Sequence, residues 1–80
     1  MDIQLIEGQY TNTEALDLLT QLIHVKIKFH ENKISSQCTE EDIKSRERRI
    51  KQLQKDLFEI RKFITANAES VSLKSFITIQ

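Results

Sequence analysis

Proline and tryptophan are absent from this sequence of 80 residues, and Gly8 is its single glycine. Because proline and glycine are the residues that most often interrupt helices and strands, their absence after residue 8 favours few, long elements. Cys38 is the only cysteine, which excludes a disulfide framework within the chain. Residues 1–80 are expected to form one domain. Such a small domain gains only about 3–5 kcal/mol from its core, so oligomerisation is the remaining common source of stability.

An excess of charge of either sign is also absent. Twelve lysines and arginines balance twelve aspartates and glutamates, so no net field attracts the chain to nucleic acid or to a membrane. No stretch approaches the roughly 20 apolar residues of a membrane span. The start, MDIQLIEGQY, is acidic, and its apolar run is too short for a signal peptide. We therefore expect a soluble, cytoplasmic protein that does not contact membranes.

The first third of the sequence predicts a strand followed by a helix. Residues 2–6, DIQLI, are rich in β-forming side chains, and Gly8 then permits a turn. Thr11 and Glu14 have the spacing of a capping box, in which each side chain accepts a hydrogen bond from the backbone amide of the other residue. We expect a helix to start there and to continue to about residue 34.

A second helix and a second strand are predicted in the remainder. Residues 35–37 form a polar break, and residues 39–42, TEED, are a second capping signature with acidic side chains at the positive end of a helix. This helix should cover about residues 40–67, with Asn67 as its terminator. Residues 71–79, VSLKSFITI, alternate apolar and polar side chains and predict a strand.

Residues 23–30, IHVKIKFH, alternate in the manner of a half-exposed strand although they lie inside the first predicted helix. We prefer a helix, because no glycine, proline, asparagine or aspartate lies between Leu18 and Phe29 to make a turn. A helix that stopped at residue 22 would be only about 16 Å long, whereas its predicted partner is about 40 Å long. A strand over these eight residues is the alternative.

Apolar residues in both helices recur at steps of three and four, the spacing of helices packed side by side. The second helix has one such line, which only Arg46 interrupts: Ile43, Ile50, Leu53, Leu57, Ile60 and Ile64. The first helix has two. Its first line is Ala15, Leu18, Leu22, Val25 and Phe29, and its second line is Leu16, Leu19, Ile23, Ile27 and Ile34. Two lines predict two partners, of which one is the second helix and the other is the strand layer, another subunit or both.

These features predict a mainly α fold: a long antiparallel helical hairpin with coiled-coil-like packing, whose short terminal strands form a two-stranded antiparallel ribbon, in the order β-α-α-β. Since the strands are too short to cover the surplus apolar surface, we expect a homodimer. We assign self-association to the second line, Leu16, Leu19, Ile23, Ile27 and Ile34.

A cluster of basic residues provides the other functional candidate. Residues 44–62 contain eight lysines and arginines against three acidic residues, a local excess of five positive charges. The candidate polyanion contacts are Lys44, Arg48, Arg49, Lys51 and Lys55. The same residues are also explained by a solvated helix face with ion pairs between successive turns, which is the preferred interpretation.

No residues predict catalysis or a cofactor. His24 and His30 lie six residues apart and point to different sides of a helix, and a contact of His30 with Cys38 would still lack two zinc ligands. No phosphate-binding loop or nucleophile motif is present. The function expected is therefore protein–protein interaction or assembly as a homo-oligomer, without enzymatic activity or metal. The alternative is a nucleic-acid-binding accessory or regulatory protein that uses the basic face of the second helix.

Overall fold

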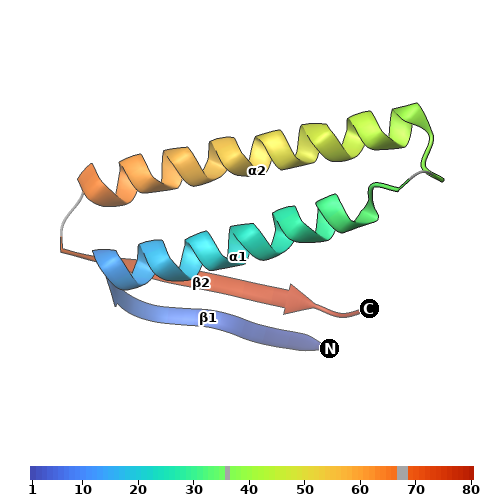
Figure 1. The fold of residues 1–80 in the computed structure, drawn as a ribbon. Helices are drawn as coiled ribbons and strands as arrows, with labels where there is room; N and C mark the ends of the chain where they lie inside the picture. The colour runs from blue at the N-terminus through green and yellow to red at the C-terminus, as the bar shows by residue number, and fades with distance from the viewer. Residues whose placement is uncertain (36, 67–68) are drawn as a thin grey trace.

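The computed structural model describes residues 1–35, 37–66 and 69–80 and confirms the mainly α order β-α-α-β. The elements are β1 (Asp2–Thr11), α1 (Asn12–Lys33), α2 (Glu40–Ala66) and β2 (Ser70–Thr78). The two helices form the predicted hairpin, and the two strands pair antiparallel. Figure 1 shows α1 between the strand ribbon and α2, with both chain ends at the same end of the ribbon.

Helix α1 begins and continues as its sequence predicts. The backbone N–H of Glu14 donates to Thr11 Oγ1 at 3.2 Å, and the backbone N–H of Thr11 donates to Glu14 Oε1 at 2.9 Å, which completes the capping box. The helix then passes through residues 23–30 without a break, so the helical prediction for IHVKIKFH is confirmed. It ends at Lys33, because the extended backbone of Ile34 stops it one residue earlier than expected.

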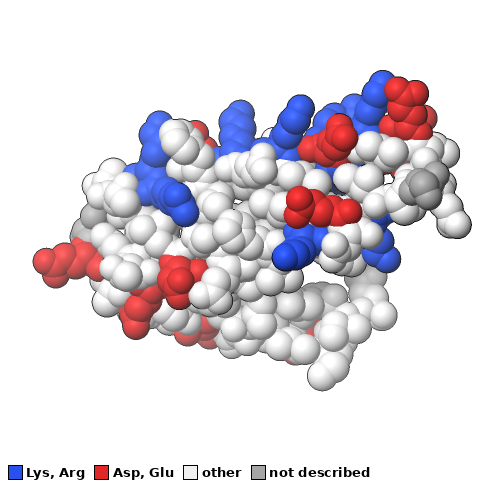
Figure 2. Space-filling view, viewed as in Figure 1, with Lys and Arg blue, Asp and Glu red and all other residues white. Residues whose placement is uncertain are grey.

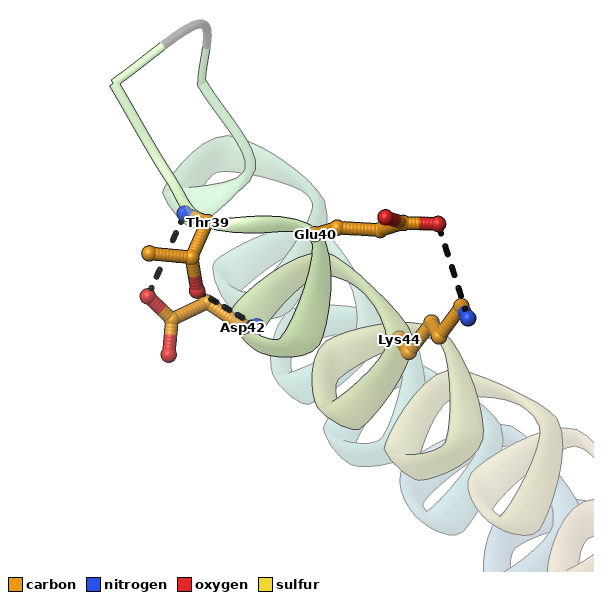
Figure 3. Close-up of polar contacts among 4 residues, drawn as sticks. All are labelled: Thr39, Glu40, Asp42 and Lys44. Atoms are coloured by element: carbon orange, nitrogen blue, oxygen red, sulfur yellow. Dashed lines mark hydrogen bonds and ion pairs between the residues drawn. The ribbon is translucent and has the colours of Figure 1, made fainter.

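Helix α2 begins with an equivalent arrangement (Figure 3). The backbone N–H of Asp42 donates to Thr39 Oγ1 at 3.1 Å, and the backbone N–H of Thr39 donates to Asp42 Oδ2 at 3.4 Å. One turn of the helix is also bridged by the ion pair between Glu40 and Lys44, at 3.5 Å. The predicted terminator, Asn67, and the middle residue of the polar break, Ser36, lie outside the described residues.

The strands differ from the prediction in length. β1 extends to Thr11 instead of ending at residue 6, because β2 offers pairing partners along its whole length. Gly8 does not turn the chain, because it pairs with Leu73 inside the ribbon. Its backbone φ is 145°, a value that residues other than glycine rarely adopt. β2 is displaced by one residue from its predicted range, to Ser70–Thr78.

A bulge in β1 changes which side chains share a face of the ribbon. The register shifts between Gln4 and Ile6, so that the intervening residue is unpaired. Ile3 pairs with Ile77 and Ile6 pairs with Ser75. Ser75 and Ile77 are two residues apart in β2 and therefore share a face of the ribbon. Their partners Ile6 and Ile3 consequently share that face as well.

The core is small and lies where the ribbon, α1 and the end of α2 meet. Only four side chains are buried among the described residues: Ile6, Ala15, Ile23 and Ile64. Val71 and Leu73 of β2 are half-buried around them. The molecule is accordingly flat, with Cα extents of 46 × 33 × 14 Å. Its radius of gyration is 15.3 Å, whereas a compact chain of this length has about 11.6 Å.

Candidate functional site

The second line of α1 faces α2. Leu19 lines an apolar groove of about 400 Å³ together with Ile60 and Ile64 of α2, and Val71 and Leu73 of β2 line it as well. His30, which continues this line three residues after Ile27, contacts Arg46 of α2. Between these two contacts, Ile23 is only 9% exposed.

Self-association through the second line stays a prediction, and the burial of its members bears on it. Ile23 is buried inside its own chain, and the other four members, Leu16, Leu19, Ile27 and Ile34, are half-buried. These five residues are therefore less exposed than Val25 and Phe29 of the first line. The exposed apolar residues of α1 are Val25 and Phe29, which both belong to the first line.

The first line is buried at its start and exposed at its end. Ala15 is fully buried, Leu18 and Leu22 are half-buried, and Val25 and Phe29 are 68% and 55% exposed. Figure 1 shows the reason: α1 and the ribbon lie together where α1 begins and diverge toward the chain ends. The second half of the first line is therefore largely exposed, although Lys33 Nζ and Arg46 Cζ lie 5.5 Å and 5.9 Å from the centre of the Phe29 ring.

The free end of the ribbon is also apolar and exposed. Ile77 follows Leu73 at an even spacing, so it shares the face that β2 turns toward the core, and Ile3 is its partner in β1. Ile3 and Ile77 are nevertheless 37% and 42% exposed, and Ile79 is 50% exposed. We refer to the following five residues together as the apolar face: Ile3, Val25, Phe29, Ile77 and Ile79.

The accessible surface of the single chain is larger than its mass predicts. It measures 6502 Å², whereas a folded monomer of 9.4 kDa exposes about 5,000 Å². The surplus is therefore roughly 1,500 Å². Stable homodimers bury about 1,000–2,500 Å² on each partner, so the surplus is of the size that one such interface covers.

A second surface, of opposite character, lies along α2. Four of the five predicted polyanion contacts, Lys44, Arg48, Lys51 and Lys55, recur at steps of four and three and therefore lie on one side of the helix. Figure 2 shows lysine and arginine side chains projecting along the outer edge of α2. The fifth, Arg49, lies away from this row and lines a pocket near the hairpin turn.

Two further residues belong to this row although the sequence analysis did not select them. Phe58 and Lys62 continue the steps of three and four beyond Lys55, and Phe58 is 61% exposed. Lys62 Nζ lies 5.5 Å from the centre of the Phe58 ring. The spacing alone would have identified both. We refer to the following six residues as the cationic row: Lys44, Arg48, Lys51, Lys55, Phe58 and Lys62.

The pocket near the hairpin turn is polar. It measures about 460 Å³ and is lined mainly by polar and charged residues that include His30, Cys38 and Arg46. Arg46 occupies the position in the α2 line where its neighbours are apolar, and its Nη1 lies 3.0 Å from His30 Nδ1. Burial, and then the positive charges of Arg46, Arg49 and Lys26, lower the pKa of His30 below its ordinary value of 6.5.

Metal-ligand chemistry is not assembled in this pocket. Cys38 Sγ donates to the backbone carbonyl of Lys33 at 3.2 Å, instead of contacting His30. Across the part of the chain that the structure describes, no three histidine, cysteine, aspartate or glutamate side chains converge in a way that could hold a metal ion. Nor is any described helix long and apolar enough to cross a membrane.

The comparisons with known proteins give no functional assignment. No protein-family model matches the chain, and no curated protein or solved structure is significantly similar to it. The function must therefore be argued from the two surfaces themselves.

Proposed function

We propose that this protein is a homodimeric assembly module in which two copies bury their apolar faces against each other. The observation that supports the proposal most directly is the surplus of roughly 1,500 Å² of accessible surface, which is on the scale of a homodimer interface. Five exposed apolar side chains account for part of it, and they come from both α1 and the ribbon end.

A second copy is the occupant that needs no further component. Most closed assemblies of small proteins are two-fold dimers, in which the same patch of each copy contacts its equivalent. An apolar patch is well suited to this arrangement, because it is complementary to itself without any pairing of charges. Only four side chains are buried among the described residues, so interface burial would also raise the stability of each copy.

The experiment is a mass measurement by light scattering coupled to size exclusion, at micromolar concentration. Phe29→Glu should convert the dimer into a folded monomer, because it replaces an apolar ring with a carboxylate that the contact would have to desolvate. Phe58→Glu is the matched control, since Phe58 is an equally exposed phenylalanine that lies outside the apolar face. This control should retain the dimer mass.

Circular dichroism would verify that both variants keep their helices. A folded wild-type protein with the mass of a single chain would reject the proposal. A Phe29→Glu variant that remains dimeric would reject the apolar face as the interface.

A further inference from the structure

The cationic row has the geometry of a straight track. Its six positions follow steps of four, three, four, three and four along one continuous helix. The stretch from Lys44 to Lys62 spans about 27 Å, so the four intervals between the five cations average roughly 7 Å. Each member lies about half a turn from the apolar line by which α2 packs on α1. The track is therefore the outermost edge of the molecule (Figure 2).

Four of the five cations of this track form no salt bridge among the described residues. The ion pair between Glu40 and Lys44 is the single salt bridge among the described residues, although the full chain has twelve acidic side chains. The carboxylate of Asp56, which could have approached Lys55 or Lys51, accepts a hydrogen bond from Gln52 Nε2 at 2.8 Å instead. Arg48, Lys51 and Lys55 are consequently exposed cations without an ion pair among the described residues.

The shape of the track selects among anionic partners. A membrane is a two-dimensional surface and would also meet the carboxylates of Glu47 and Glu59, which lie beside the row. A nucleic-acid strand is a line of regularly spaced phosphates, which matches a row of charge one residue wide. Phe58 adds an exposed aromatic ring within the row, and proteins that bind single strands combine such rings with a basic track.

From these features we propose that the outer edge of α2 is a binding track for a single nucleic-acid strand, with the five cations of the row on successive phosphates and Phe58 stacked against a base. Binding of this kind is independent of base sequence and strongly dependent on salt. The proposal does not depend on dimerisation through the apolar face, which lies on other elements.

The salt dependence gives a quantitative expectation. For single strands the logarithm of the binding constant falls with the logarithm of salt concentration with a slope of about −0.7 per phosphate contact, so five contacts predict about −3.5. Affinity should then fall roughly a hundredfold between about 50 and 200 mM salt. The measurement is fluorescence anisotropy of a labelled oligothymidylate of about 20 nucleotides titrated with the full chain.

The decisive variants are matched in charge. Lys51→Gln combined with Lys55→Gln removes two contacts and should reduce the slope to about −2.1. Lys28→Gln combined with Lys74→Gln removes the same charge from exposed positions outside the row, and should leave the slope near −3.5. Equal losses in the two double variants would show attraction to net charge alone and would overturn the track.

Two further measurements test the nature of the ligand. Phe58→Leu should weaken binding about fivefold or more while the salt slope stays unchanged, because it removes the stacking ring and no charge. Tighter binding to a duplex of the same length would overturn the assignment to a single strand. Equal binding to polyglutamate or to phosphatidylglycerol vesicles, lost in the Lys51/Lys55 variant, would overturn the assignment to nucleic acid.

Discussion

The two helices differ in the number of apolar lines in their sequences, and therefore in the number of elements that they can pack against. α1 carries two apolar lines, and it lies between the ribbon and α2 (Figure 1). α2 carries one apolar line and the cationic row, and it forms an edge of the molecule (Figure 2). The number of apolar lines on a helix thus matches the number of surfaces that it packs against. By this measure the first line is incompletely covered, since Val25 and Phe29 in its second half are exposed.

The largest effect should come from breaking α1, because it holds both layers together. Ile27→Pro removes a backbone hydrogen bond in the middle of this helix and should cost about 3 kcal/mol or more, which is most of the stability of so small a domain. We expect loss of cooperative unfolding in urea, followed by circular dichroism. Ile27→Leu preserves the side-chain volume, so its free energy of unfolding should lie within about 1.5 kcal/mol of the wild-type value. A wild-type midpoint for the proline variant would show that α1 is not central.

A smaller and graded effect is expected along α2, where burial differs between positions. Ile64 is only 3% exposed, and Ile64→Ala should cost about 2–5 kcal/mol. Leu53 lies on the same apolar line but is half-buried, so Leu53→Ala should cost clearly less. Lys55→Ala, on the cationic row, should change the free energy of unfolding by no more than about 0.5 kcal/mol. The same loss at all three positions would contradict the peripheral place of α2.

The helices could be predicted from the sequence because their signals are local. The capping residues Thr11 and Thr39 mark each start within a few positions of the chain. The steps of three and four then require no knowledge of the partner. The helical nature of residues 23–30, despite their strand-like alternation, followed from the absence of any turn residue and from the length that α2 needs to be covered.

The strands were predicted less well because their extent depends on residues far away in the sequence. β1 continues past Gly8 only because β2 pairs with it, and the bulge next to Gln4 is a property of the pair. The two lines of α1 pose a similar problem, since both are equally apolar. Which of them faces α2 depends on how the hairpin crosses, and no single residue encodes this.

A third difficulty concerns the candidate polyanion residues, because residues that are adjacent in the sequence need not lie on the same side of a helix. Arg49 is next to Arg48 in the chain, yet a step of one residue rotates it away from the row. Lys62 is seven residues from Lys55 and lies on the row. Composition therefore located the basic helix, whereas the helical repeat is needed to select the residues that act together.

The smallest expected effect concerns the polar end of the hairpin, where His30 Nδ1 lies 3.0 Å from Arg46 Nη1. Arginine only donates, so this contact requires neutral His30. Because burial and nearby positive charges lower its pKa below 6.5 in the folded chain, the unfolded chain binds the proton more readily. Stability should therefore be complete above pH 6.5 and should decline as the pH falls toward the lowered pKa of the folded chain. Urea midpoints between about pH 7.5 and 5 would measure this decline. His30→Gln should flatten it, whereas His24→Gln should preserve it, and an unchanged decline in His30→Gln would assign it to other groups.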